Sequence, residues 1–285
     1  MRARARQRTF SSFSDNQQMF KSMTFRSLFL DSHQKPVSAW VEVCWGGLII
    51  ILAAFICAMI MAGAAGVSLG GWEAVWKFKN VFWKGWLLTI LISLASLLLS
   101  SLIGVGVALI RRSQIIPLRC LALLYVEIVR GTPLLVQILF LFYVVAHGIG
   151  LENRLIAGML TLSLFSGAYL AEMIRAGIES IPASQLESAR AIGFTTPQIY
   201  RFVIAPQALR QILPSLAGQF ASLIKDSSLL SIIGVTEFTF AAQQSFSATY
   251  RTMESFLPLA LGYLILTLPI SMLSKLLERR LRYET

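Results

Sequence analysis

The sequence predicts an all-α, polytopic membrane protein, and three features of the chain support this fold class. Hydrophobic residues make up 56% of the 285 residues and charged residues only 14%, whereas soluble domains carry about 25% charged residues. The mean hydropathy is +0.68. Several continuous apolar runs approach the ~20 residues that a helix needs to cross hydrocarbon. Because these runs are continuous rather than alternating, spanning helices are expected.

The distribution of basic residues predicts the orientation of the spans. Six spans are expected, at residues 44–66, 86–110, 120–147, 155–175, 210–233 and 256–275. The connections on one side, at residues 1–43, 111–119, 175–210 and the C-terminal tail, hold 18 of the 25 Lys and Arg residues, against five in the opposite loops. Positive charge marks the cytoplasmic side, so both termini are expected there. The net charge of +11 therefore indicates topology, and no nucleic-acid partner is expected.

The N-terminal part differs from the remainder of the chain. Residues 1–43 are polar and basic, and we expect a cytoplasmic arm that is disordered or lies on anionic lipid. A secretory signal is not expected, because the first apolar run begins far from the start. The three cysteines, Cys44, Cys57 and Cys120, match no zinc or disulfide spacing and are interpreted as packing residues.

The longest internal cytoplasmic segment, residues 179–206, predicts a short helix followed by a sharp turn. Ser184 and Glu187 have the spacing of a capping box. Gly193 is placed to end the helix, because glycine adopts the left-handed conformation at little cost. The helix would contain about eight or nine residues, with Ala189 and Ile192 as a small apolar face.

A second helix is expected directly after that turn. Thr196 would be its N-cap and Pro197 would lie in its first turn. An ordinary connection between two spans is the alternative interpretation of the whole segment.

The same segment resembles the EAA loop of ABC importer permeases. The family pattern is Glu-Ala-Ala, three residues, Gly, nine residues, then Ile-x-Leu-Pro. This chain has Glu187-Ser188-Ala189, three residues, Gly193, nine residues, then Val203-Ile204-Ala205-Pro206. Ser188, Val203 and Ala205 depart modestly from the pattern. The resemblance implies a coupling helix that docks on an ATP-binding subunit through Glu187, Ala189, Arg190, Gly193 and Pro206.

A second set of motifs resembles the polar amino acid branch of these permeases (histidine, arginine, glutamine and related substrates). The motifs are Glu127-Ile-Val-Arg130-Gly131-Thr132-Pro133-Leu134, Tyr169-Leu-Ala-Glu172-Met-Ile-Arg175-Ala-Gly177-Ile178 and Lys225-Asp226-Ser227-Ser228-Leu229. The resemblance covers about residues 84–282 and implies the type I permease fold. That fold has a five-span core, and here an additional helix at 44–66 precedes it. The resemblance also implies the bacterial inner membrane.

The third predicted span is expected to break at Gly131-Thr132-Pro133. The glycine would end one helix, the threonine would cap the next, and the proline would lie in its first turn. Residues 118–147 would extend about 45 Å as one helix, against about 30 Å of hydrocarbon. Glu127 and Arg130 are three residues apart and can pair, and Gln137 continues their face.

Ionisable residues within spans are costly and suggest function. A zwitterionic amino acid needs both acceptors and donors, and a mixed set fits that need. The alternative interpretation is that these residues form structural ion pairs, Glu127–Arg130 and Glu172–Arg175. The candidate substrate-path residues are Glu127, Arg130, Gln137, Glu172, Lys225 and Asp226.

The sequence contains no P-loop and no catalytic or metal-binding cluster. No cofactor is therefore expected on this chain, and ATP would be bound by a partner subunit. The resemblance implies a dimer of ATP-binding subunits, a second permease (identical or homologous) and an extracytoplasmic solute-binding protein. Three alternative functions are an ABC permease for another small polar solute, an ion-coupled secondary transporter and an integral membrane enzyme. A secondary transporter would usually show an internal repeat.

Overall fold

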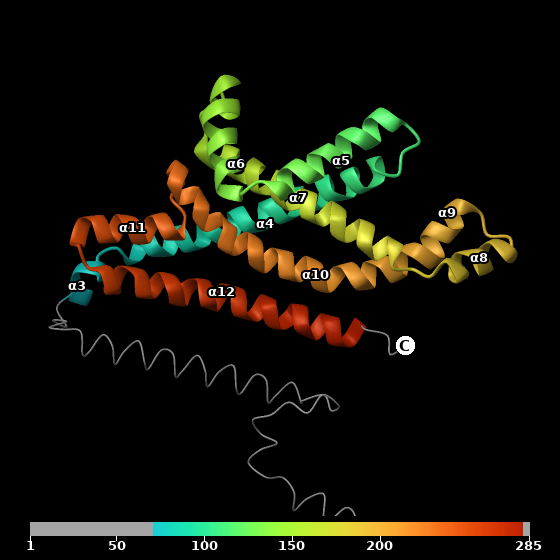
Figure 1. Ribbon diagram of the computed structural model, residues 1–285. Coiled ribbons are helices and arrows are strands. Elements are labelled where there is room, and N and C mark those ends of the chain that lie inside the picture. The colour runs from blue at the N-terminus through green and yellow to red at the C-terminus, as the bar shows by residue number, and fades with distance from the viewer. Residues whose placement is uncertain (1–70, 282–285) are drawn as a thin grey trace, which may run out of the picture. The chain divides into compact units, whose positions relative to one another are not determined.

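The computed structural model describes residues 71–281, and every regular element in that range is a helix (Figure 1). The arm expected at 1–43 and the additional helix expected at 44–66 lie outside the described residues. The elements are α3 Gly71–Trp76, α4 Lys79–Ile110, α5 Ile116–Gly131, α6 Leu134–Phe140, the π-helix η2 Leu141–Ala146, α7 Arg154–Glu179, α8 Ala183–Ala191, α9 Thr196–Ile199, the π-helix η3 Tyr200–Ile204, α10 Ala205–Asp226, the 3₁₀-helix η4 Ser227–Ile233, α11 Phe238–Thr249 and α12 Thr252–Leu281.

Three helices in the described residues, α4, α7 and α12, are long and apolar enough to cross a membrane. With the bent pair α5 and α6–η2 taken as one span, the number rises to four. The span expected at 210–233 falls on α10 and η4, which are not among them. Helices were thus predicted correctly in this region, while the number of spans stays a prediction.

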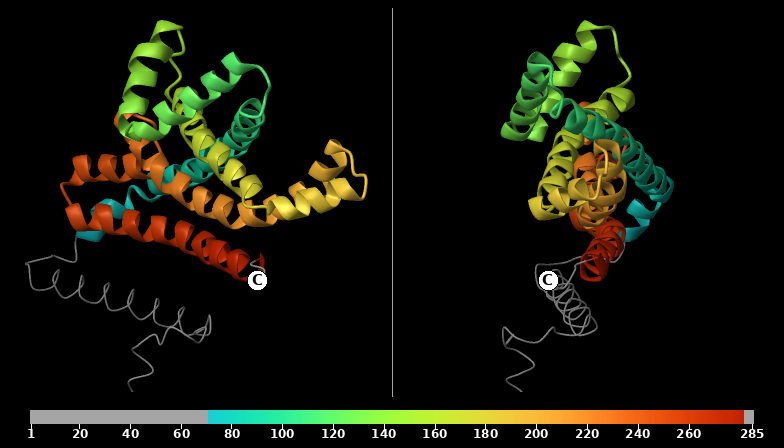
Figure 2. Two further views of the ribbon diagram at one scale, coloured as in Figure 1. Left: turned by 45° about the vertical axis from the view of Figure 1, so that its right-hand side comes forward. Right: turned by 90° about the vertical axis from the view of Figure 1, so that its right-hand side faces the viewer.

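The break in the third predicted span is confirmed. Helix α5 ends at Gly131 and α6 begins at Leu134, and the two segments bend by 110° (Figure 2). The expected N-cap was wrong, because Pro133 takes that position. Thr132 is instead extended, as a residue before proline tends to be. Its hydroxyl donates to the Ile128 carbonyl at 2.8 Å, back into α5.

Small residues allow α4 and α7 to pack closely. A side chain at Gly104 would meet the Leu170 Cβ at 2.7 Å, and one at Gly167 would meet the Ile103 Cγ2 at the same distance. Close approach of small residues is what associates helices in lipid, because apolar burial gains little there. Several serines of these two helices are also buried, namely Ser93, Ser96, Ser100, Ser163 and Ser166.

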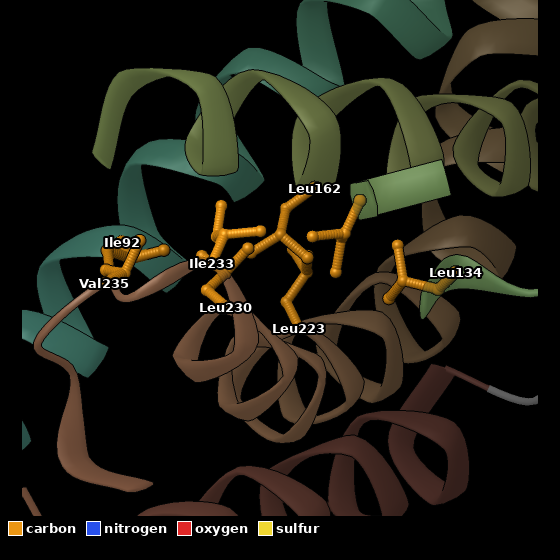
Figure 3. Packing of buried hydrophobic residues seen from close by; sticks show 8 residues of the cluster. Ile92, Leu134, Leu162, Leu223, Leu230, Ile233 and Val235 are labelled. Carbon is orange, nitrogen blue, oxygen red and sulfur yellow. The ribbon is translucent and has the colours of Figure 1, made fainter. Parts of the chain in front are cut away.

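The main apolar core joins five elements (Figure 3). It collects side chains from α4, α6, α7, α10 and η4, together with Val235 in the turn after η4. Its buried members are Ile92, Leu134, Ile138, Leu162, Leu223, Leu230, Ile233 and Val235. The core therefore fixes the piece after the break, α6, against the long helices.

The long helices separate two sets of short elements (Figure 1). Helices α8 and α9 lie at one end, and α3 and α11 lie at the other. Helix α11 was not predicted as an element of its own. It is a 12-residue helix between η4 and α12, and Tyr250, in the left-handed conformation with φ of 53°, separates it from α12.

Candidate functional site

The α8–α9 loop, defined as residues 179–206, begins with the nine-residue helix that the sequence predicted. Helix α8 spans Ala183–Ala191, and its N-cap is Pro182. Ser184 therefore lies in the first turn and is not the N-cap, so the predicted capping box with Glu187 is wrong. Pro182 is extended, with ψ of 137°, and the helix starts directly after it.

The end of α8 confirms the role predicted for glycine. Gly193 is left-handed, with φ of +88°. Its N–H donates to the Arg190 carbonyl at 2.9 Å, and the Phe194 N–H donates to the Ala189 carbonyl at 3.1 Å. This pair of bonds is a Schellman motif, which satisfies carbonyls at the end of the helix. Gly193 thus fixes the direction in which the chain leaves α8.

The second helix of the loop starts one residue earlier than expected. Thr195, not Thr196, caps α9, and its N–H donates to the Gln198 side-chain oxygen at 2.8 Å. Pro197 lies in the first turn as predicted. The chain then continues through η3 into α10, so Pro206 lies in the first turn of α10.

A small apolar cluster anchors the α8–α9 loop to the ends of α7 and α10. Its buried members are Ile181, Ala189, Ile199, Ile204 and Ala208, and Phe194 packs against it. A side chain at Gly177 would meet the Ile212 Cγ1 at 2.9 Å, which shows how closely α7 approaches α10 beside the cluster. The loop is therefore packed directly against these two helices.

The outward side of α8 carries charge and one large apolar side chain. Glu187 and Arg190 are exposed, while Ala189 is buried in the cluster. The expectation that Ala189 and Ile192 share one apolar face is wrong. Ile192 is 73% exposed, because it is the C-cap and precedes the left-handed turn at Gly193. Ile192 therefore lies on the surface of the loop together with the exposed charges of α8.

A polar cavity of about 1140 Å³ lies beside the α8–α9 loop. The loop forms one wall through Pro182 and Gln185, and α10 forms another through Arg210 and Gln211. The C-terminal end of α12 contributes Ser274, whose hydroxyl donates to the Pro214 carbonyl at 2.7 Å. The first turns of α10 thus lie between the loop and α12.

Among the candidate substrate-path residues, Glu172 forms a cluster with three arginines. Its Oε2 accepts from Arg111 at 2.6 Å and lies 3.9 Å from Arg130. Its Oε1 accepts from the Arg175 Nε at 2.8 Å, and Arg175 also pairs with Glu179. The predicted Glu172–Arg175 pair is confirmed. Sequence reasoning missed Arg111, which lies 61 residues away.

Arg130 pairs differently from the expectation. In the described residues, its ion pair is with Glu172 and not with Glu127, and its guanidinium lies 5.5 Å from the centre of the Tyr169 ring. Glu127 is exposed. The alternative interpretation of a Glu127–Arg130 pair is therefore wrong, because α7 offers Arg130 both a carboxylate and an aromatic face.

Gln137 bridges the break between α5 and α6. Its side-chain nitrogen donates to the Val129 carbonyl at 2.7 Å and to the Thr132 hydroxyl at 2.8 Å. These bonds satisfy a backbone carbonyl and a hydroxyl group at the break between the two helices. They give Gln137 a positioning role in the bend, and nothing in them tests its predicted role toward a substrate.

Lys225 and Asp226 lie far from the Glu172 cluster. They end α10, which starts at the α8–α9 loop, whereas Glu172 lies seven residues before the loop. At 1.5 Å per residue, the two sites differ by about 20 Å along the helices. Lys225 is exposed and Asp226 is half-buried. The structure thus does not bring the six candidate residues into one site.

Glu237 is a buried acid that sequence reasoning missed. It is fully buried and caps α11, accepting from the N–H groups of Thr239 at 2.8 Å and Phe240 at 2.9 Å. The Tyr263 hydroxyl donates to it at 2.9 Å. Burial raises the pKa of Glu237 above its ordinary value, while the two backbone N–H groups and Tyr263 lower it. The signal in the sequence was a glycine, Gly234, followed three residues later by an acid that could cap the next helix.

Known proteins are similar to this chain in sequence and in fold. The model of the binding-protein-dependent transport system inner membrane component family matches residues 100–283. A Bacillus subtilis (strain 168) protein named "Probable glutamine ABC transporter permease protein GlnM" is 37% identical over 203 residues, which cover 71% of this chain and 94% of the relative. The glutamine transport system permease protein GlnP of Escherichia coli K12 is 33% identical over 214 residues, which cover 74% of this chain and 97% of the relative.

A solved structure shows the same arrangement of helices. It is a crystal structure of an amino acid ABC transporter with histidines, with 35% identity and a TM-score of 0.70. The match covers 76% of this chain and 100% of that chain. The helical fold and its loop are thus those of an ABC importer permease, as the motifs predicted. The chain belongs to the family of binding-protein-dependent transport system inner membrane components.

Proposed function

We propose that this protein is the membrane-spanning subunit of an ATP-driven importer for polar amino acids. The observation that carries the proposal is the α8–α9 loop at one end of the long helices (Figure 1). Two relatives above 30% identity are named as glutamine permeases, and the solved relative is an amino acid transporter. These names support amino acids as the substrate class.

The importer would assemble from several subunits. Two ATP-binding subunits would dock on the α8–α9 loops of two permeases, identical or homologous, and an extracytoplasmic binding protein would deliver the solute. ATP would be bound by those partners, and no cofactor is proposed for this chain. Both termini would be cytoplasmic, in the inner membrane. Closure of the ATP-binding subunits would pull on α8, and the cluster at Ala189 would pass that movement to α7 and α10.

The exposed Ile192 provides a direct test of docking. Ile192→Ser is expected to weaken co-purification of the ATP-binding subunit about tenfold, because truncated apolar anchors at interfaces cost 1–2 kcal/mol or more. Ile149→Ser is the matched control, since Ile149 is 74% exposed but precedes α7 at the opposite end of that helix. Equal co-purification of both variants would exclude the loop as the docking site.

The substrate is tested separately in proteoliposomes. The permease, its ATP-binding subunit and its binding protein are reconstituted, and ATP-dependent uptake of glutamine, histidine and arginine is compared with that of a neutral sugar. Uptake of at least one amino acid above the sugar background supports the proposal. Uptake of the sugar alone, or uptake driven by an ion gradient without ATP, contradicts it.

A further inference from the structure

A second cavity lies at the same end of the long helices as the α8–α9 loop, and its walls are basic. It has a volume of about 260 Å³ and lies between the end of α4, the start of α5 and the end of α7. Four arginines and one glutamate contribute to its lining: Arg111, Arg112, Arg119, Arg175 and Glu179. At about 30 Å³ per water molecule, the cavity has room for a phosphate-sized group with some water.

The positive charge of this arginine cavity exceeds what the neighbouring acids neutralise. Arg111 and Arg175 pair with Glu172, and Arg175 pairs also with Glu179. Arg112 donates to the Tyr200 hydroxyl at 2.7 Å, which is a neutral partner. The Arg119 side chain forms no ion pair or hydrogen bond with any described residue. Two positive charges therefore remain for a ligand from outside residues 71–281.

Apolar side chains also line the arginine cavity, namely Ala108, Leu123 and Ile178. Leu123 follows Arg119 by one helical turn, so the two share the cavity side of α5, and Leu123 is 37% exposed. Ile116, at the start of α5, is 62% exposed as well. Basic cavities between membrane helices that continue into an apolar surface suit a lipid, with the headgroup in the cavity and the acyl chains along the helix.

We propose that the arginine cavity binds the phosphate headgroup of an anionic phospholipid, whose acyl chains lie along the side of α5 that carries Ile116 and Leu123. The leaflet concerned is the one at the α8–α9 end, which is cytoplasmic if the proposed orientation holds. A lipid held there would contact α4, α5 and α7 together, next to Tyr200 in the α8–α9 loop. The composition of the membrane would thereby influence the position of the loop.

The test measures lipid binding by the purified full-length permease without its partners. Fluorescent phosphatidylglycerol is titrated into the detergent-solubilised protein, with phosphatidylcholine as the zwitterionic comparison. Arg119→Ala is expected to weaken binding of phosphatidylglycerol about fivefold, the effect of one arginine near a lipid surface. Arg119→Lys should retain most of the affinity. The melting temperature should not change, because Arg119 has no partner in the described residues.

Lys275→Ala is the matched control for general surface charge. Lys275 is an exposed basic residue near the same end of α12, outside the arginine cavity. Unchanged affinity in this variant supports the proposal, and an equal loss in both variants overturns it. Competition by millimolar inorganic phosphate as strong as by the lipid would also overturn it, in favour of a free anion. If Arg119→Ala leaves the lipid affinity unchanged but loses the ATP-binding subunit during co-purification, the arginines bind that subunit and not a lipid.

Discussion

Single residues in this permease owe their roles to backbone conformation or to distant partners. Gly193 matters because its φ of +88° is accessible to glycine and strained for most other residues. Glu172 matters because three arginines from three helices surround its carboxylate. The two residues therefore lead to different predictions, one for local structure and one for the stability of the bundle.

Replacing Gly193 should loosen the α8–α9 loop. Gly193→Ala is expected to cost about 1 kcal/mol of local stability, because an L side chain is strained at positive φ. Amide hydrogen exchange in α8 should accelerate about fivefold. Gly193→Asn should show a smaller effect, since asparagine tolerates this conformation. Gly106→Ala is the control, because the new methyl group would meet nothing within 4 Å and its φ is not positive. Equal rates of amide hydrogen exchange in α8 for Gly193→Ala and Gly106→Ala would contradict the role of the turn at Gly193.

Replacing Glu172 distinguishes the two interpretations of this charged residue. Glu172→Gln leaves arginines without a counter-charge. Because Glu172 is only partly buried, the free energy of unfolding is expected to fall by about 2 kcal/mol. Glu179→Gln should cost less than about 1 kcal/mol, because its side chain is 52% exposed and pairs with Arg175 alone. Thermal unfolding in detergent measures the stability of both variants. An unchanged melting temperature of Glu172→Gln together with lost amino acid uptake would favour a substrate-path role.

Elements of this fold are joined at their ends as well as along their sides. Glu237 caps α11, and its carboxylate also accepts from Tyr263 in α12. The backbone N–H that follows Glu237 donates to the Thr89 hydroxyl of α4 at 3.1 Å. Gly85 allows this contact, because a side chain there would meet the Glu237 carbonyl at 2.9 Å. One residue thus fixes three helices at the end opposite the α8–α9 loop.

Removing the Glu237 side chain should destabilise the junction of these helices. Glu237→Ala is expected to cost about 2 kcal/mol, from the lost cap and the lost bond to Tyr263. Thr236→Ala is the control, because Thr236 is exposed and adjacent in sequence. Thermal unfolding of the purified chain compares the two variants, and an equal melting temperature would show that the junction does not depend on this carboxylate.

The titration of Glu237 should make the free energy of unfolding depend on pH. Burial raises its folded-state pKa above the unfolded value, so the unfolded chain releases this proton first as pH rises. The stability contribution is therefore complete below the unfolded pKa and is lost as pH rises through the folded pKa. Relative to Glu237→Gln, the wild-type melting temperature should fall across that window. A difference in melting temperature between the wild type and Glu237→Gln that stays constant with pH would contradict the raised pKa of Glu237.

At the scale of the whole molecule, the two ends of the helices differ in chemistry. One end carries the α8–α9 loop, the polar cavity and the arginine cavity. The other carries α3, α11 and the exposed Tyr250. This difference matches the bias of basic residues that predicted a cytoplasmic side, and it allows the orientation to be tested directly.

Thiol labelling should report which end faces the cytoplasm. Cysteines are introduced as Tyr250→Cys and Ile192→Cys, both at exposed positions, in a chain whose Cys44, Cys57 and Cys120 are replaced by serine. A membrane-impermeant maleimide should label Tyr250→Cys in intact spheroplasts. It should label Ile192→Cys only after the membrane is permeabilised. The reverse pattern would invert the proposed topology.

The sequence by itself determined the class of fold, the break after Gly131 and the helix and turn of the α8–α9 loop. Each follows from local chemistry: apolar length, a glycine, or a proline within a few residues. Errors of one or two residues at the caps, such as Ser184 for Pro182, also have a local origin, because neighbouring residues can serve as the cap.

Only the tertiary structure decided the partners of the charged residues. Glu172 bonds to Arg111 across 61 residues of chain, and Thr89 bonds to Glu237 across 148. Spacing along one helix identified the Glu172–Arg175 pair but gave the wrong partner for Arg130. The physical reason is that a charged side chain in a helical bundle pairs with the nearest opposite charge in space. In this permease, packing of α4, α5 and α7 determines which charges meet.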